Sequence, residues 1–320
     1  MKPMLANTLE IGLEKHERQW ARVMNEDYTM EPKLDGIRLL LSFDQHGRLF
    51  QAFTRSGRNV IDQVPALWKL ECPELPAWTV LDCEFGYVIR PDLIDFNQTM
   101  RVMGSGHAEA QRKAYEIKFL PTAHVFDILM TGDRWTSGLP QGERREMIES
   151  LHAPKKSWHG MRLTDSHVVL GYEHFDAFYT TYVNYGGEGV MLKNTMATYV
   201  QESRPTQTWY KVKKFATADV VITGFQEGQG KYKGQVGAVK FGFYERNNAL
   251  GGGGQLVECG QCSGMDDMTR LLITASQAAL MHSVMEVRYF GLTAGTMRHP
   301  QFLRLRQDKK MFECTPDQVS

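Results

Sequence analysis

One short segment of the sequence combines residue types that suit chemistry on phosphate groups. In "EPKLDGIRLLLSF", which begins at Glu31, Lys33 precedes Asp35, Gly36 and Arg38 at the start of an apolar run. A lysine amine that has lost its proton is a nucleophile, and cationic side chains stabilise the charge of a phosphate. A pattern of this kind arises by chance in such a chain at roughly the level of one in a thousand. A solvated lysine in a turn is the alternative interpretation, and the rest of the sequence bears on the choice.

Further segments of related chemistry follow in order along the chain. They are "TRSG" at 54–57, "LDCEFG" at 81–86, "VFDIL" at 125–129, "EGVMLK" at 188–193, "WYKVK" at 209–213 and "FLRLRQDK" at 302–309. Carboxylates and cationic side chains dominate this series, as expected for a site that binds a polyphosphate together with Mg²⁺, which prefers oxygen ligands. The phosphate loop G-x-x-x-x-G-K-[ST] is absent, and "GQGKYKGQVG" at 228–237 lacks its spacing. Its absence favours covalent capture of a nucleotide over hydrolysis.

The ordered series resembles the motifs of the covalent nucleotidyltransferases, and in detail those of the ATP-dependent DNA ligases of the small two-domain type found in phages and viruses. The resemblance runs from Lys33 to Lys309. It implies that Lys33 takes AMP from ATP as a lysyl phosphoramidate and passes it to the 5'-phosphate of a nick, where the 3'-OH displaces it. It also implies ATP and Mg²⁺ as cofactors, nicked double-stranded DNA as partner and a monomer. An RNA ligase or an mRNA-capping guanylyltransferase, which shares the lysine chemistry, is the alternative.

The resemblance implies roles for residues around the nucleotide and the nick. Glu31 matches the residue that reads the adenine amino group, and Phe126 matches the aromatic ring stacked under the base. Arg38 and Arg55 match arginines near the ribose and at the nick phosphates. Asp35 is similar to the family aspartate near the nick 3'-OH.

Acids and lysines of the later segments have implied roles at the phosphates. Glu84 matches the acid that binds the ribose hydroxyls or supports the metal, and Glu188 matches the metal-supporting carboxylate. Lys211 and Lys213 match the pair that contacts the α-phosphate, with Lys193 on the opposite wall of the pocket.

The last motif matches the family, whereas two positions in earlier motifs differ from the family pattern. Arg306, Asp308 and Lys309 match residues that grip and orient the pyrophosphate leaving group. Cys83 stands where the family usually has glycine, and Thr54 stands where serine commonly precedes the arginine. Both replacements are small, so we expect the pocket to persist.

A nucleophilic Lys33 has an electrostatic requirement. A lysine with an ordinary pKa of about 10.4 is almost wholly protonated near neutral pH, so its pKa must fall by roughly three units, worth about 4 kcal/mol. We expect Lys211 and Lys213 to lie beside Lys33 and to disfavour its charge.

The periodicity of the first two thirds predicts the elements that position these residues. Apolar residues at helical spacing after Asn7 predict a helix over 7–20, and two apolar runs around "DQHG" predict a hairpin over 37–57 directly after Lys33. Further strands are predicted over 78–89 and 117–130. Helical spacing also occurs in three segments, at 104–116, 139–152 and 171–187.

The residue pattern of the last third differs from that of the first two thirds. Apolar runs separated by glycine turns extend from 219 to 260, and the pattern then predicts one helix over 265–281 and a strand over 283–292. Such a pattern predicts an OB-fold β-barrel. We therefore predict an α+β protein, in which residues 1–216 form a nucleotidyltransferase domain, ATP-grasp-like and built of antiparallel sheets with helices, and residues 217–320 form the OB-fold domain. Loops 228–237 and 247–254 are candidates for contact with the DNA backbone, with a plain hairpin turn as the alternative for the first.

Composition limits the remaining possibilities. The 320 residues are 42% hydrophobic and include 37 basic and 37 acidic side chains, so DNA binding must rely on local patches. Five cysteines are few and odd in number, which does not suit a secreted disulfide framework. The first residues lack the apolar block of a secretion signal, so we expect a cytoplasmic protein, of the host cell if the source is viral.

Overall fold

The computed structural model describes residues 2–11, 16–63, 72–152, 160–245, 254–293 and 295–319. The chain divides into two compact units, Met1–Lys213 and Lys214–Ser320. The assignment of residues 1–216 and 217–320 to functional domains stays a prediction. Most of the candidate loop 247–254 lies outside the described residues. No helix in the described ranges is long and apolar enough to cross a membrane.

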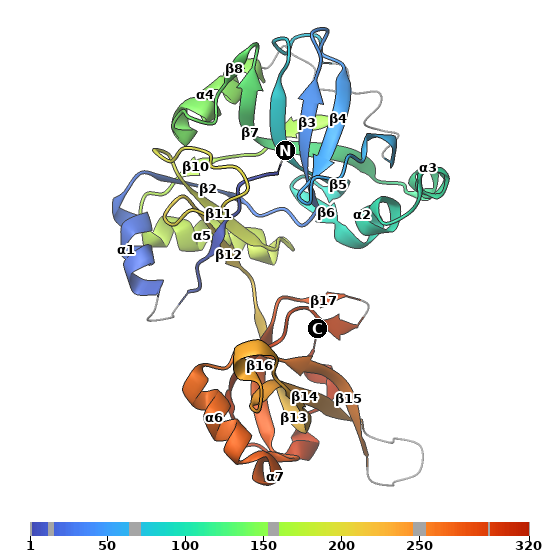
Figure 1. Cartoon of the computed structure of the whole chain (residues 1–320), viewed down its shortest axis with the longest axis vertical. Coiled ribbons are helices and arrows are strands. Elements are labelled where there is room, and N and C mark those ends of the chain that lie inside the picture. The colour runs from blue at the N-terminus through green and yellow to red at the C-terminus, as the bar shows by residue number, and fades with distance from the viewer. Residues whose placement is uncertain are drawn as a thin grey trace. The chain divides into compact units, whose positions relative to one another are not determined.

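The first unit contains a five-stranded sheet built from short, widely separated segments (Figure 1). Its strands are, in spatial order, β1 (Asn7–Thr8), β12 (Trp209–Lys213), β11 (Gly189–Asn194), β2 (Tyr28–Pro32) and β10 (His167–Val168). Helices α1 (Glu17–Asn25) and α5 (Tyr172–Asn184) cover one face, where Val23 and Phe175 join a buried apolar cluster with Tyr28, Val190 and Val212. The other face is therefore free for polar residues.

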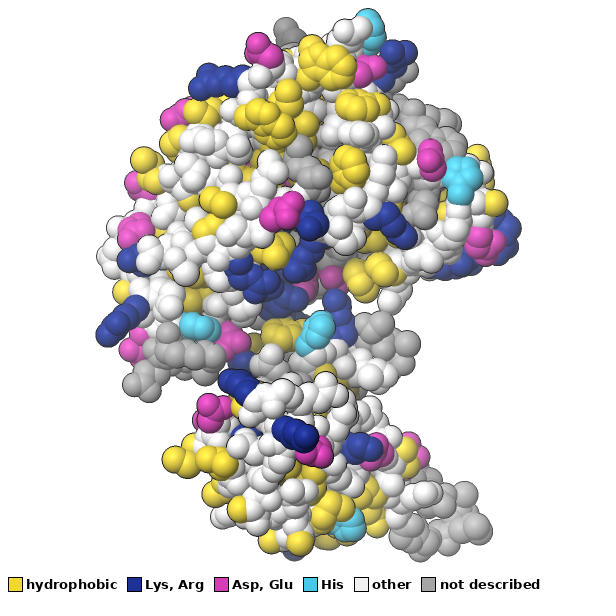
Figure 2. Space-filling model, in the orientation of Figure 1, with side chains coloured by type: hydrophobic (Ala, Val, Ile, Leu, Met, Phe, Trp, Pro, Cys, Tyr) yellow, Lys and Arg dark blue, Asp and Glu magenta, His cyan; other side chains and the backbone are white. Residues whose placement is uncertain are grey.

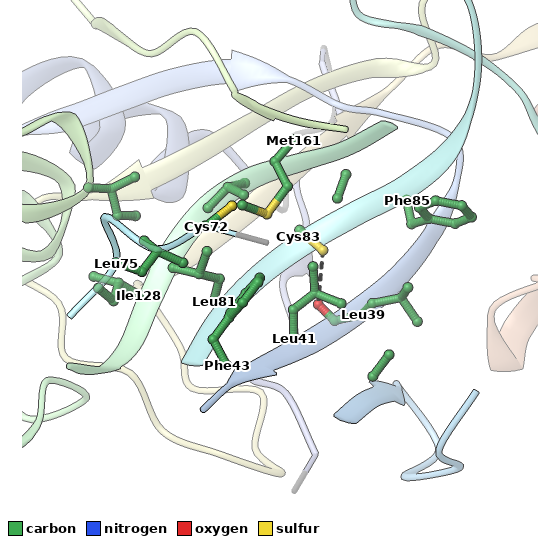
Figure 3. Packing of buried hydrophobic residues seen from close by; sticks show 14 of the residues in the cluster. Leu39, Leu41, Phe43, Cys72, Leu75, Leu81, Cys83, Phe85, Ile128 and Met161 are labelled. Carbon is green, nitrogen blue, oxygen red and sulfur yellow. Dashed lines mark hydrogen bonds between the residues drawn. The ribbon is translucent and has the colours of Figure 1, made fainter. Parts of the chain in front are cut away.

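A second sheet of the first unit carries the predicted hairpin. Its main strands are, in spatial order, β4 (Leu49–Thr54), β3 (Ile37–Phe43), β5 (Val80–Arg90), β7 (Leu120–Thr131) and β8 (Arg134–Trp135), while β6 (Leu93–Asp95) pairs with β5 and β9 (Met161–Leu163) runs parallel to β7. Figure 3 shows the core on one face of this sheet, where Leu39 and Leu41 of β3 pack with Leu81 and Cys83 of β5. The Cys83 thiol donates to the Leu39 carbonyl at 3.3 Å, so this departure from the family pattern lies in the core.

Helices close the outer side of this sheet. They are α2 (Phe96–Met103), α3 (His107–Glu116) and α4 (Gln141–Leu151), and the 3₁₀ turn η2 (Ile61–Gln63) lies beside them in the chain. The Asp95 side chain caps α2 by accepting from the Gln98 N–H at 2.9 Å. Ile148 of α4 enters the same core as Leu39 and Leu81.

The second unit is a five-stranded sheet that curls on itself. Its strands are, in spatial order, β15 (Gln255–Cys262), β14 (Val236–Glu245), β13 (Ala216–Glu227), β16 (Val284–Tyr289) and β19 (Gln301–Leu305). The N–H of Phe302 donates to the Ser263 carbonyl at 2.8 Å, which links the start of β19 to the end of β15. This order, with helices between β15 and β16, is consistent with the predicted OB-fold.

Smaller elements complete the second unit. They are helices α6 (Asp267–Ala275) and α7 (Gln277–Leu280), the pair β17 (Leu292–Thr293) and β18 (Thr296–Met297), and the 3₁₀ turns η4 (Gly230–Tyr232), η5 (Met311–Glu313) and η6 (Pro316–Gln318). The core of this unit includes Val220, Phe241 and Met285.

The α+β class, the hairpin and the longer strands and helices are confirmed, but two predicted helices are wrong in detail. Asn7 does not cap a helix, because it pairs with Tyr210 in β1 and its side chain donates to the Pro205 carbonyl at 2.7 Å. The helix there begins only at Glu17. The predicted helix over 265–281 is two helices that meet at Ser276.

Candidate active site

A pocket of about 600 Å³ lies in the first unit. Its walls come from both sheets and from the N-terminal segment. Among the lining residues are Leu5, Ala6, Glu31, Lys33, Arg38, Thr54, Arg55, Glu84, Phe126, Met191, Lys193, Arg204, Trp209, Lys211 and Lys213. Most of the residues that the motif series singled out in the first unit therefore share one cavity.

Strand alternation explains how β11 and β12 deliver several of these side chains. Successive side chains of a strand point to opposite faces. Lys193 is paired across the strands with Trp209, and Met191 with Lys211, so these four lie on the pocket face. The intervening Val190, Leu192, Tyr210 and Val212 face the core under α1 and α5.

Lys33 lies between β2 and β3 and is held by an acid. Its ammonium forms an ion pair with Glu188, whose other carboxylate oxygen pairs with Lys213 at 2.5 Å. Burial opposes ionisation of Glu188, but the two lysines outweigh it and hold its pKa below the usual range. The Lys33 N–H donates to the Gly189 carbonyl at 2.8 Å, which fixes the backbone next to Glu188.

Glu84, on β5, is the second carboxylate of this region. Burial raises its pKa to about 7, although Lys33 and Arg38 act in the opposite direction, and Glu188 adds to the increase. Its Oε1 accepts from the Gly36 N–H at 3.1 Å, so the loop that follows Lys33 is tied to β5. A carboxyl with this pKa is only partly ionised near neutral pH, and a further cation would favour its ionised form.

Lys211, on β12, has an amine whose pKa is strongly perturbed. Burial, together with the charges of Lys213, Arg204, Lys33 and Arg55, lowers its pKa to about 8. Figure 2 shows Lys and Arg side chains gathered at one place on the visible face of the first unit. Such a concentration of positive charge favours a polyanion as ligand.

The opposite end of the pocket is aromatic and contains a buried ion pair. Lys193 Nζ lies 2.6 Å from Glu31 Oε2 and donates to the Phe126 carbonyl at 3.2 Å. The same ammonium lies 4.5 Å from the centre of the Phe126 ring and 4.7 Å from that of Trp209. Burial lowers the pKa of Lys193, against the effect of Glu31.

Arg38 lines the pocket but its guanidinium is largely committed to the protein. It binds Asp82 through two hydrogen bonds of 2.9 and 2.6 Å, and it donates to the Met4 carbonyl at 2.7 Å. Tyr199 also donates to Asp82 at 2.6 Å. Arg38 thus connects the N-terminal segment to β3 and β5 beside the Phe126 ring, whose centre is 5.3 Å away.

Two predicted site residues of the first unit lie outside the described lining. Asp35 is two residues from Lys33 but is not among the residues that line the pocket in the described ranges. Glu188 reaches the site through Lys33 and Lys213, which both line it.

The three predicted residues of the second unit form a group of their own. Arg306 binds Asp308 through hydrogen bonds of 2.9 and 2.8 Å, and its Nη1 donates to Asp219 at 2.9 Å. Lys309 lies 3.6 Å from the same Asp219. The hydrogen bonds with Arg306 hold the pKa of Asp308 well below its usual range. Asp219 was not predicted from the sequence.

Other lining residues were also missed by sequence reasoning. Trp209, which lines the pocket, and Asp82, which does not line it but binds Arg38, fall inside quoted motifs, so the motifs themselves were the available signal. Leu5, Ala6 and Arg204 come from segments that resemble no motif, and only the fold brings them to the pocket.

The comparisons with known proteins agree with this geometry. A family model described as ATP dependent DNA ligase domain matches residues 3–213. The DNA ligase of Archaeoglobus fulgidus is 25% identical over 307 residues, which cover 89% of this chain and 52% of that protein. The chain thus spans about half the length of the curated relatives that it first matches.

Solved structures share the fold. A structure described as Pmar-Lig_PreS3 has a TM-score of 0.68 at 20% identity and covers 95% of this chain and 67% of its own. A Lig E DNA ligase, described as binding DNA with a minimal scaffold, has a TM-score of 0.62 at 20% identity and covers 96% of this chain and 99% of its own. Because the family model matches well over half of the sequence, the chain belongs to the ATP-dependent DNA ligase family.

Proposed function

We propose that this chain is an ATP-dependent DNA ligase that seals nicks between a 5'-phosphate and a 3'-OH in duplex DNA, and that it acts as a monomer. The observation that carries the proposal is the position of Lys33, which shares a cationic pocket with Lys211 and Lys213 and with the aromatic wall of Phe126. The family membership supports the same reaction.

In the first step, the Lys33 amine attacks the α-phosphorus of ATP. The Lys33 ammonium first gives one proton to solvent; a P–N bond then forms, the bond to the pyrophosphate oxygen breaks, and the nitrogen gives a second proton to solvent. Lys33 and Lys213 are both bound to Glu188, so the phosphates of ATP must compete with this acid for the two lysines. Lys211, whose pKa is about 8, remains largely charged at neutral pH and stabilises the negative charge that develops on the α-phosphate.

The aromatic end of the pocket would hold the base. Phe126 offers a ring for stacking, and Glu31 offers a carboxylate oxygen to the adenine amino group. Glu84 lies on the side of Lys33 and would accept from the ribose hydroxyls or support the metal.

Glu84 and Glu188 fit a magnesium ion. In the described part of the chain, no three His, Cys, Asp or Glu side chains gather as a metal site. Mg²⁺, however, is commonly held by one or two carboxylates together with substrate phosphates, so two acids are enough. The raised pKa of Glu84, about 7, identifies a buried carboxyl that a cation would stabilise in its ionised form. When bound, Mg²⁺ neutralises phosphate charge and orients the phosphates.

The later steps return the lysine to its starting state. An oxygen of the nick 5'-phosphate attacks the AMP phosphorus and the P–N bond breaks; the 3'-OH then attacks the 5'-phosphorus, loses its proton and releases AMP. Arg55 at the pocket mouth is proposed to bind nick phosphates, and Asp35 to act near the 3'-OH. Arg306, Asp308 and Lys309 keep the role of orienting pyrophosphate, on the strength of the resemblance.

Self-adenylation and nick sealing test this proposal. We expect ATP labelled at the α-phosphate, but not GTP, to label the protein, and the labelled protein to seal a nicked DNA duplex. Lys33→Ala should abolish labelling, whereas Lys118→Ala, an exposed lysine of the first unit, should retain it. Labelling by GTP, or sealing of nicked RNA alone, would favour the capping or RNA-ligase alternative. Unchanged labelling of Lys33→Ala would contradict the proposal.

A further inference from the structure

Glu31 has one carboxylate oxygen that no hydrogen bond satisfies. The residue is only 2% exposed. Its Oε2 is bound to Lys193 at 2.6 Å, whereas its Oε1 is buried and has no hydrogen-bond partner among the described residues. Glu31 lines the same pocket as Phe126, and Oε1 is the carboxylate oxygen that Lys193 leaves without a hydrogen bond.

A second cation approaches Glu31 from a helix that no motif covers. Arg145 of α4 places its Nη1 3.8 Å from Glu31 Oε1, which is longer than a hydrogen bond. This Nη1 is itself buried and lacks a hydrogen-bond partner within the described residues. The other side of the guanidinium is fixed, because Nε donates to Glu149 at 2.6 Å.

The two cations have different effects on the carboxylate. Lys193 carries up to three N–H donors and could bind both oxygens of Glu31 if the carboxylate turned about its last side-chain bond. The positive charge of Arg145 lies on the side of Oε1 and attracts it away from Lys193. One oxygen of the carboxylate is therefore bound to Lys193, and the other keeps its capacity to accept a hydrogen bond.

A carboxylate oxygen without a hydrogen-bond partner can discriminate between nucleotide bases. An exocyclic amine presents an N–H to Oε1, whereas a carbonyl at the same position presents a second acceptor and leaves the buried oxygen without a partner. Sites built to hydrogen-bond one group reject an analogue that lacks it, because their polar atoms are then unsatisfied.

We propose that Arg145 is a positioning residue for nucleotide selection, which holds Glu31 Oε1 free for the 6-amino group of adenine and so disfavours 6-oxo purines. The inference rests on the proposed function, in that ATP is taken to occupy the pocket lined by Glu31 and Phe126. It adds a residue of α4 that lies behind the pocket wall and would act only through Glu31.

The test compares ATP with inosine triphosphate, whose base has an oxygen in place of the 6-amino group and carries no exocyclic amino group. Equilibrium binding and self-adenylation are measured for the full chain and for Arg145→Met, which keeps an unbranched apolar side chain without the charge. We expect the dissociation constant and KM for ATP to rise about tenfold, the preference for ATP over inosine triphosphate to fall about tenfold, and kcat to change little. Arg145→Lys should restore part of the preference.

Controls separate positioning from a loss of structure. Arg112→Met removes an exposed arginine of α3 that also pairs with acids, and it should leave the preference unchanged. Combining Arg145→Met with Glu31→Gln should give no further loss of preference beyond Glu31→Gln alone, because Arg145 acts through Glu31. Thermal unfolding of each variant identifies any that do not fold.

The outcomes distinguish this inference from the proposed function. If folded Arg145→Met keeps the wild-type preference, or weakens both nucleotides equally, the inference is overturned while the ligase proposal stands. If the wild type prefers ATP through Arg145 but never becomes adenylated, the ligase proposal fails and the inference stands. Sealing of a nick that already carries 5'-AMP needs no ATP, so Arg145→Met should perform it at the wild-type rate.

Discussion

At the scale of single residues, the surroundings of Lys33 differ from the expectation. Lys211 and Lys213 were expected beside the amine and Glu188 was expected to support the metal, but Glu188 lies between Lys33 and Lys213 and binds both. Glu188 thus holds the ammonium groups of Lys33 and Lys213 close together when no nucleotide is bound. A triphosphate can replace Glu188 as their counter-charge, so nucleotide binding and release of Lys33 are coupled in the proposed reaction.

Glu84 supplies a prediction on pH. Burial raises its pKa from 4.5 to about 7 in the folded chain, so the folded state binds more protons than the unfolded state between these values. Its contribution to stability is therefore complete below pH 4.5 and is lost as the pH rises through about 7. Relative to Glu84→Gln, the free energy of unfolding of the wild type should be larger at pH 5 than at pH 8 by up to about 3 kcal/mol.

Urea unfolding at both pH values, with a chelator to exclude divalent cations, measures this difference. Glu146→Gln, an exposed glutamate of α4, is the matched control and should show no such dependence. A wild-type chain whose stability relative to Glu84→Gln is the same at pH 5 and pH 8 would show that Glu84 is ionised throughout.

At the scale of elements, the site depends on the close approach of β11 and β12. Gly189 begins β11 with φ near 146°, and a Cβ on it would lie 2.0 Å from the Val212 carbonyl oxygen and 2.8 Å from Lys213 Cα. Glycine thus permits the pairing that places Glu188 next to Lys213. The motif "EGVMLK" requires its glycine for this physical reason.

Gly189→Ala should therefore damage both stability and activity. We expect a loss of about 2 kcal/mol or more in the free energy of unfolding, because neither strand can move without breaking the ladder, and a large drop in the rate of self-adenylation. Gly138→Ala, where a Cβ would meet nothing within 4 Å, is the control. Equal stability of the two variants would mean that β11 and β12 can separate at little cost.

Two adjacent arginines of helix α4 have different roles. Arg144 is fully buried and binds Asp127 of β7 through two hydrogen bonds of 2.7 and 2.9 Å, which fixes the helix on the sheet. Arg145 is about 100° further around the helix and lies near Glu31. Substitution of Arg144 would leave the buried Asp127 without its ion-pair partner and should lower the free energy of unfolding. Substitution of Arg145 should instead change the preference between nucleotides.

At the scale of the whole molecule, the equal numbers of basic and acidic residues shape the expected DNA binding. Many exposed arginines are already paired with acids, as Arg101 and Arg112 are with Glu116. Arg55 and Arg204 line the pocket and form no ion pair with another described residue, so they are candidates for contact with the phosphates. Binding should therefore be modest and dominated by release of counterions.

The affinity for a nicked duplex gives the corresponding prediction. The dissociation constant should rise at least about tenfold between 50 and 200 mM salt, because even a few phosphate contacts produce a steep dependence. Fluorescence anisotropy at fixed pH, with an intact duplex measured in parallel, provides the data. A flat response would contradict DNA binding through phosphate contacts.

Much of the fold and of the candidate site could be predicted from the sequence. The hairpin after Lys33 and the strands that carry Glu84 and Phe126 have long apolar runs, and such periodicity is readable locally. The sheet that carries Glu31 and Lys211 was missed, because its strands are two to six residues long and alternate core with site residues. Segments this short do not show a period of their own.

The sequence by itself determined the order of the reactive residues, and with it the family and the expected chemistry of Lys33. Only the tertiary structure decided which charges meet, such as Glu188 at Lys33 and Arg145 at Glu31. These contacts join residues more than 100 positions apart, and they depend on strand pairing and on the packing of α4. A local pattern cannot encode such contacts, because the residues become neighbours only after the two sheets have formed.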